Sequence, residues 1–286
     1  MSDMQLDVEL SLRQLTIFNS LFILGLILLV GVILPPIFSP NVRRSPLWFT
    51  FMGSWLLYCV SCLLLIGNQL GPDPPFGLCL FQAALIHSMP SLATICGVCF
   101  IVDVYCIMRI SLLHSYWIPM RRTLPLLAFP VVSFIFLFFL SVGIGLQDHS
   151  TVGRVQNMFC RINTGLPTLL SAILSAFALL VAIAVDVAAV VLLYRVTPPS
   201  TSEKSPDTKP PIARGMLIRI FIFSLLTLFG LGLNASVFFH YSDTDVRGNM
   251  LIALLPILMA VLFGAQRDIL TGWWFWRRIA HPEGAV

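Results

Sequence analysis

The chain has 286 residues, of which 58% are hydrophobic and only 10% are charged, and its mean hydropathy is +0.92. A water-soluble globular protein needs more polar surface than this composition supplies, so a soluble fold is excluded. The net charge of +4 is small. Its basic residues gather at the ends of apolar stretches, which indicates membrane topology and no nucleic-acid partner.

Seven apolar stretches follow one another along the chain, separated by short polar breaks. A bilayer core about 30 Å thick takes about 20 apolar residues per helix, and none of the stretches alternates like a membrane β-strand. The predicted fold is therefore an all-α membrane protein, a bundle of seven transmembrane helices at residues 15–270 after an extracellular tail at residues 1–14. We place the helices at Leu15–Phe38, Pro46–Gly67, Leu78–Met108, Thr123–Gly145, Leu166–Tyr194, Met216–His240 and Asn249–Leu270.

The distribution of Lys and Arg predicts the orientation, because basic residues stay on the cytoplasmic side. With the C-terminus inside, 13 of the 17 basic residues are cytoplasmic, and only Arg13, Arg154, Arg161 and Arg247 remain outside. The opening residues lack the basic region and cleavage site of a secretory signal peptide, so we expect the first helix to remain as a permanent span. These features predict a multi-pass protein of the plasma membrane with its N-terminus outside.

Two cytoplasmic segments differ from the spans in composition. Residues 195–214 are rich in Pro, Ser, Thr and Lys, which predicts a flexible loop in which Ser205 is a candidate phosphate acceptor. Residues 271–286 contain four consecutive aromatic residues at 273–276, followed by Arg277 and Arg278, which predicts an amphipathic helix lying on the inner leaflet in contact with membrane lipids. No internal repeat is visible, which counts against transporter folds built from duplicated halves.

The cysteines fall into two groups. Cys79 opens the third span and Cys160 lies in the second outer loop, both on the oxidising side, so we predict a disulfide that pins this loop over the mouth of the bundle. The other five lie within spans or near an inner end. Four of them form two C-x-x-C pairs, which in apolar helices are packing residues more often than metal or redox sites.

Polar residues on the outer half of the bundle are candidates for ligand binding. Gln82 and His87 lie one and two turns below Cys79, and Asn234 lies beside two glycines in the sixth span. Polar groups within a membrane are costly and usually face the bundle interior, so Gln82, His87 and Asn234 are expected to line a ligand cavity. A packing role with satisfied hydrogen bonds is the alternative for His87.

Two carboxylates and a proline mark the inner half. Asp103 is 24 residues after Cys79, about 36 Å along a helix, which places it at the cytoplasmic end of the third span. Asp186 lies in the inner half of the fifth span and needs a partner such as Arg109 or Arg219. Structural pairing and a switching role both remain open for Asp186. Pro256 can make the seventh span bendable.

The seven spans, the outside N-terminus, the two outer cysteines and the surface helix together resemble a G-protein-coupled receptor. Asp103-Val104-Tyr105 falls at the spacing from Cys79 where rhodopsin-like receptors carry Asp-Arg-Tyr, with Val104 in place of the arginine. Pro256 resembles the proline of that family's Asn-Pro-x-x-Tyr motif, although Met259 stands where the tyrosine would be. The resemblance implies switch roles for Asp103, Val104, Tyr105 and Pro256, and Asp186 is a candidate switch residue because of its position within the fifth span.

Three segments look like seven-span receptor-like proteins of mushroom-forming fungi, which are distantly similar to fungal pheromone receptors: Asn41–Trp48, Leu78–Ala83 and Phe263–Leu270. The resemblance implies a plasma-membrane receptor that senses a small or lipidic ligand and signals to a heterotrimeric G protein. Positive-inside topology explains the basic inner loops equally well without a partner. The loop residues expected to contact the G protein are Arg109, Arg121, Arg122 and Arg214.

Several other classes are less consistent with the sequence. A retinal protein needs a lysine within a span, whereas Lys204 and Lys209 both lie in the inner loop. A zinc hydrolase needs a cluster of ligands, and only His87 lies well inside a span. We therefore expect no enzyme activity and no cofactor. A transporter or channel that uses Asp103 and Asp186 is the main alternative, and a non-signalling accessory membrane protein remains a third.

Overall fold

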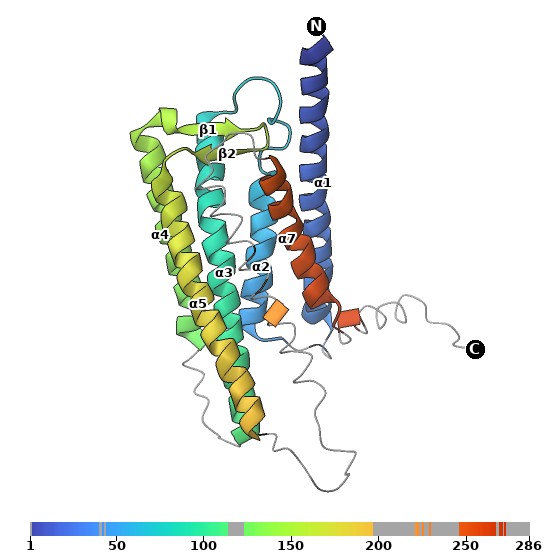
Figure 1. The fold of residues 1–286 in the computed structure, drawn as a ribbon, viewed down its shortest axis with the longest axis vertical. Helices are drawn as coiled ribbons and strands as arrows, with labels where there is room; N and C mark the ends of the chain where they lie inside the picture. Colours follow the sequence, from blue (N-terminus) through green and yellow to red (C-terminus); the bar gives the residue numbers. More distant parts are fainter. Residues whose placement is uncertain are drawn as a thin grey trace, which may run out of the picture.

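The computed structural model describes residues 2–39, 42, 44–113, 123–196, 221–222, 225, 229, 246–266, 269–270 and 272. Within them the long helices are α1 (Ser2–Phe38), α2 (Pro46–Leu63), α3 (Phe76–Leu113), α4 (Thr123–Gln147), α5 (Gly165–Val196) and α7 (Val246–Gly264). Between α4 and α5 lie a short 3-10 turn, η2 (His149–Thr151), and two strands, β1 (Val152–Val155) and β2 (Phe159–Ile162) (Figure 1).

The described part of the chain contains five helices long and apolar enough to cross a membrane, and α7 adds a shorter apolar helix at Gly248–Gly264. The chain is therefore a helical membrane protein. The predicted sixth span, Met216–His240, lies outside the described residues except for positions 221, 222, 225 and 229. The predicted surface helix at 271–286 also lies outside them except for position 272, as does the predicted flexible loop beyond position 196.

Several helix ends differ from the predicted ones by a few residues, and the start of α1 and the end of α2 have a visible cause. Helix α1 begins at Ser2 and runs through the predicted tail at residues 1–14, because no Pro or Gly interrupts it there. Helix α2 ends at Leu63 instead of Gly67. The chain leaves it through tight turns in which Ile66 and Asn68 donate backbone hydrogen bonds to Leu63 and Leu65, and Gly67 adopts a left-handed φ of 90°.

Helix α3 lies at the centre of the described bundle, in contact with α2, α4, α5 and both strands, while α1 packs against α7 and α2 (Figure 1). Three buried aromatic rings join α2, α3 and α7. Phe51 stacks on Phe100 at 5.9 Å between ring centroids, and Phe263 meets both rings edge-on. Such ring pairs add to the packing of the core beyond the area they bury.

The inner ends of α1, α2 and α7 are joined by one polar contact. Arg44 donates a hydrogen bond to the Gln266 side chain, and its guanidinium lies over the Trp48 ring, 5.7 Å from the centroid. Ser45 caps α2 by accepting a hydrogen bond from the Trp48 amide. Arg44 therefore contacts a residue 222 positions away in the sequence, just after the end of α7.

Candidate functional site

The second outer loop forms a β-hairpin held against α3. Strands β1 and β2 pair antiparallel, and their turn places Gln156 and Asn157 at φ values of 49° and 59°. Asn is among the residues that tolerate this left-handed conformation best. The predicted disulfide between Cys79 and Cys160 is present, with 5.2 Å between the two Cα atoms. It fixes β2 to the outer end of α3.

Gln82 adds a second tether one turn below the disulfide. Its side chain is completely buried. The Oε1 atom accepts a hydrogen bond from the Cys160 amide at 2.9 Å, and Nε2 donates one to the Ser61 carbonyl at 3.0 Å. One amide therefore satisfies a buried N–H of β2 and links β2 to both α3 and α2, which favours a structural role for this side chain.

His87 forms a third tether from α3. It is buried, with Nε2 lying 3.3 Å from the Ile162 amide and Nδ1 3.4 Å from the Thr168 hydroxyl at the start of α5. A backbone amide can only donate, so Nε2 must be unprotonated here and Nδ1 carries the proton of the neutral ring. His87 thus joins α3, β2 and α5. The predicted contact of Gln82 and His87 with a ligand stays a prediction, and Asn234 lies outside the described residues.

Gln69 and Asn19 connect the tip of the hairpin to α1 and to the turn after α2. Gln69 donates from Nε2 to the Met158 carbonyl at 3.0 Å, and the two side-chain amides exchange hydrogen bonds of 2.7 and 3.1 Å. Next to them the ring of Phe18 stacks on Phe159 at 6.1 Å. These contacts hold the tip of the hairpin against α1.

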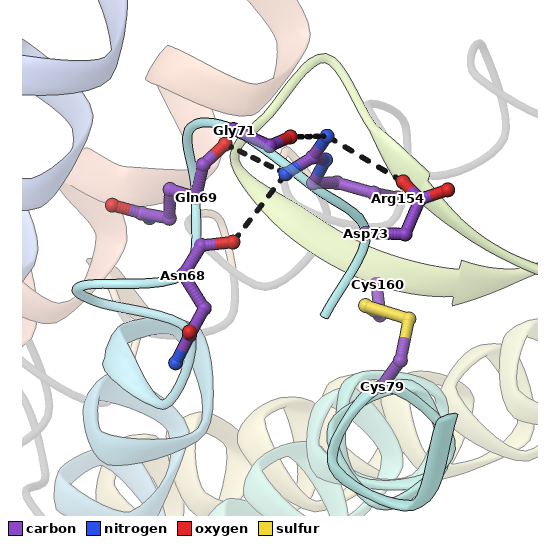
Figure 2. A network of polar contacts seen from close by, with 7 residues as sticks. All are labelled: Asn68, Gln69, Gly71, Asp73, Cys79, Arg154 and Cys160. Carbon is purple, nitrogen blue, oxygen red and sulfur yellow. Dashed lines mark hydrogen bonds and ion pairs between the residues drawn. A yellow bond between two sulfur atoms is a disulfide. The ribbon is translucent and has the colours of Figure 1, made fainter. Parts of the chain in front are cut away.

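Arg154 on β1 binds the turn that follows α2 (Figure 2). Its guanidinium donates to the carbonyl oxygens of Asn68, Gln69 and Gly71 at 3.4, 3.1 and 3.1 Å. The Asp73 carboxylate lies 3.5 Å away, yet this side chain is 93% exposed whereas that of Arg154 is only 14% exposed. The three carbonyls therefore provide most of the attachment, because exposed ion pairs contribute little.

The hairpin also reaches α7. Asn249 donates a hydrogen bond to the Gln156 side chain at 3.1 Å. Met158 and Ile162 are fully buried beneath the strands. The hairpin therefore contacts the outer ends of α1, α3 and α7 and the turn after α2, and Figure 1 shows it lying across that end of the bundle.

The turn that leads into β1 has its own cap. The Asp148 carboxylate accepts hydrogen bonds from the hydroxyl and the amide of Ser150 at 2.6 and 3.0 Å. Since both bonds favour the ionised form, they lower the pKa of Asp148 below its ordinary value, the hydroxyl contributing most. The cap therefore contributes stability above the pKa of the unfolded carboxyl and loses it as the pH falls through the lowered value.

The predicted switch residues of α3 lie near its inner end. Val104 is buried, whereas Asp103 and Tyr105 are half-buried and Arg109 is exposed. The side chains of Asp103 and Cys106 line a cavity between α3 and α4. In Figure 1, α3 and α5 extend beyond the inner ends of α2 and α7. Asp103 itself lies ten residues before the end of α3 that is opposite the hairpin.

The remaining predicted residues lie apart from the hairpin. Asp186 is half-buried on α5 and makes an interaction of its own. Pro256 is buried on α7 against α1, where a Cβ built on Gly25 would be only 3.1 Å from the Pro256 Cβ. The predicted partner-binding residues outside the described part of the chain are Arg121, Arg122 and Arg214.

The polar residues of the hairpin contacts that were missed from the sequence include Asn19, Gln69 and Arg154. The sequence did give a reason to single out Arg154. It is one of only four basic residues on the predicted outer side, and the positive-inside rule does not explain a basic residue there. Gln69 lies in a Gly/Pro-rich turn, and Asn19 is one polar residue in a long apolar helix. Their contact across 50 positions in the sequence had no local signal.

No protein-family model matches this chain, and a search of curated proteins found no match either.

Proposed function

We propose that this chain is a seven-span, plasma-membrane receptor of the G-protein-coupled type, with its N-terminus outside, that senses a small or lipidic ligand. The observation that carries this proposal is the β-hairpin tethered to the third helix by the disulfide between Cys79 and Cys160. A rigid outer cover over helices that can shift at their inner ends suits a protein that converts a binding event into a change on its cytoplasmic face.

The hairpin also favours a lipidic ligand over a polar one. Met158 and Ile162 fill the space beneath the strands, and the polar atoms of Gln82 and His87 are engaged with β2. A ligand arriving from water would have to break these buried hydrogen bonds, each worth about 1 kcal/mol net. A ligand dissolved in the bilayer can approach between helices and leave the hairpin intact.

The cytoplasmic side supports coupling through shape and charge. Helices α3 and α5 extend past their neighbours (Figure 1), and their exposed residues there include Arg109, Tyr194 and Arg195. Val104, at the position of the family's arginine, is buried and only 6% exposed. A switch at this site therefore acts through packing of α3 and not through an ion pair between neighbours.

The test is nucleotide exchange by a Gα subunit from the same organism, measured in membranes that contain the chain. Wild type is compared with Val104→Arg, which restores the charge that the resemblance implies. Exchange above that of membranes without the chain, in either form, supports the receptor. No exchange in either form, with folded protein at the cell surface, contradicts it.

The transporter alternative makes a different prediction. Asp103 lines a cavity and Asp186 is half-buried within a span, so a transporter would use one or both to move a proton or cation. Asp186→Asn should then abolish flux in proteoliposomes. In a receptor the same substitution should change basal nucleotide exchange and leave the liposomes as tight as protein-free ones.

A further inference from the structure

A cavity of about 280 Å³ lies between the inner halves of α3 and α4 and has no role in the hairpin or in the packed core. Its described walls are mainly aliphatic, and the oxygen-bearing side chains among them supply one carboxylate and one hydroxyl. The residues that line it are Val102, Asp103, Cys106 and Ile107 on α3, and Thr123, Pro125 and Leu126 on α4.

The carboxylate of Asp103 has no hydrogen bond or ion pair within the described part of the chain. It is half-buried beside aliphatic groups of α3 and α4. Carboxylates at this depth of a membrane protein usually pair with a cation. The cavity therefore offers a carboxylate to a positively charged ligand.

The number of residues along α3 and along α4 places the cavity at the level of the lipid headgroups of the inner leaflet. Asp103 is 24 residues below Cys79, about 36 Å along α3, which exceeds the hydrocarbon thickness of about 30 Å. Thr123 is the first residue of α4, equally far from the outer end of that helix at Gln147. Both polar groups of the cavity thus lie where lipid headgroups begin.

Large apolar side chains of α4 are exposed next to the cavity and further into the bundle. Leu124, which lies between two lining residues, is 72% exposed, and Phe129, six residues after Thr123 along α4, is 54% exposed. Large apolar side chains with this exposure at membrane depth contact acyl chains. A lipid can therefore place its headgroup in the cavity while its chains remain against α3 and α4.

We propose that this cavity binds an inner-leaflet phospholipid with a primary-amine headgroup, phosphatidylethanolamine, whose ammonium donates hydrogen bonds to Asp103. Its phosphate then lies toward the N-terminus of α4, where backbone N–H groups and the helix dipole favour an anion. A choline headgroup fits less well. It has no N–H to donate, and among the described residues that line the cavity there is no aromatic ring to bind a quaternary ammonium through its face.

The test uses the full chain, delipidated in a non-ionic detergent and titrated with lipids of identical acyl chains. The lipids are phosphatidylethanolamine, its N,N-dimethyl form and phosphatidylcholine, and bound lipid is counted by native mass spectrometry. Affinity should fall along this series as N–H donors are lost, with a total difference on the order of fivefold for one ion pair at a partly solvated site.

Two substitutions on α3 test the role of the carboxylate, and one outer-side substitution serves as a control. Asp103→Asn keeps the shape of the side chain and should reduce ethanolamine-lipid binding to the choline level. Ile107→Lys, one helical turn away, supplies an internal ammonium that should pair with Asp103 and remove the preference as well. Asp148→Asn changes an exposed carboxylate on the outer side and should leave the preference unchanged.

Equal affinity for the three lipids in the wild type, or an unchanged preference in both Asp103→Asn and Ile107→Lys, would overturn the proposal. Should Asp103→Asn fail to fold, judged by its elution volume, Ile107→Lys still decides. Glycerophosphoethanolamine has the headgroup without the chains and should not compete at the lipid's concentration. Equal competition by it would contradict a lipid occupant. None of these outcomes depends on coupling to a G protein.

Discussion

Replacing Gln82 by Leu tests whether the hairpin is held to α3 by this buried amide. Leucine has nearly the same volume, so the change removes hydrogen bonds without opening a cavity. The Cys160 amide then loses its acceptor at 2.9 Å, and the Ser61 carbonyl loses a donor at 3.0 Å. The disulfide keeps Cys160 in place, so its N–H group stays buried without a partner.

A buried, unsatisfied donor costs about 1–3 kcal/mol, which the better burial of leucine offsets only in part. We therefore expect a loss of about 2 kcal/mol in the free energy of unfolding. For a bundle of this size that corresponds to a fall in Tm of about 4–8 °C. Gln147→Leu, at the exposed end of α4, is the matched control and should change Tm by less than about 2 °C.

The chain carries its own reporters for the assay. Its buried free thiols react with a thiol-sensitive dye only on unfolding, so a thermal ramp in detergent yields Tm directly; they are Cys59, Cys62, Cys96 and Cys99. A Tm for Gln82→Leu equal to that of Gln147→Leu would refute the claim that the Gln82 hydrogen bonds stabilise the hairpin on α3. Gln82→Glu adds a second check, because a protonated carboxyl reproduces the donor and acceptor of the amide and should recover stability at acidic pH.

Two further predictions compare matched positions. Gly145→Ala should lower Tm relative to Gly143→Ala. A Cβ at position 145 would overlap Leu80 Cδ1, whereas a Cβ at position 143 would meet nothing within 4 Å, so the free energy of unfolding should differ by about 1–3 kcal/mol. Equal Tm values would show that Leu80 moves aside freely. Arg154→Lys should lower the free energy of unfolding by about 1–2 kcal/mol, because one ammonium group cannot donate to three carbonyl oxygens as the guanidinium does. Asp73→Asn should lower the free energy of unfolding by less than about 0.5 kcal/mol, because this ion pair is exposed. Thermal melts at low and high salt distinguish the carbonyl contacts of Arg154 from its ion pair with Asp73. A larger loss of stability for Asp73→Asn than for Arg154→Lys would contradict the conclusion that the carbonyl contacts provide most of the attachment.

The long helices were predictable because a membrane span has a strong compositional signal. Five predicted spans coincide with α1 to α5 to within a few residues at most ends, and α7 falls within the predicted seventh span apart from its first three residues. The start of α1 was wrong because polar residues of good helix propensity continue a helix into water without any hydropathy signal. The disulfide was predictable as well, since only Cys79 and Cys160 lie on the predicted outer side.

The hairpin was not predictable from the sequence. Strands β1 and β2 have four residues each, and their pairing depends on contacts with helices far away in the chain. Gln82 and His87 were recognised as buried polar residues, but a sequence cannot show whether such a group turns toward a ligand or toward a neighbouring backbone amide. In the structure both turn toward β2. The cavity at Asp103 could not be predicted from the sequence either, because it depends on how α3 and α4 approach each other.

The most direct test of the receptor proposal is complex formation between the chain in lipid nanodiscs and a nucleotide-free heterotrimeric G protein from the same organism. We predict a complex that survives gel filtration without nucleotide and dissociates when GTP is added, for the wild type or for Val104→Arg. Correctly folded nanodisc protein that binds no G protein in either form, with or without nucleotide, would contradict the receptor and favour the transporter or accessory role.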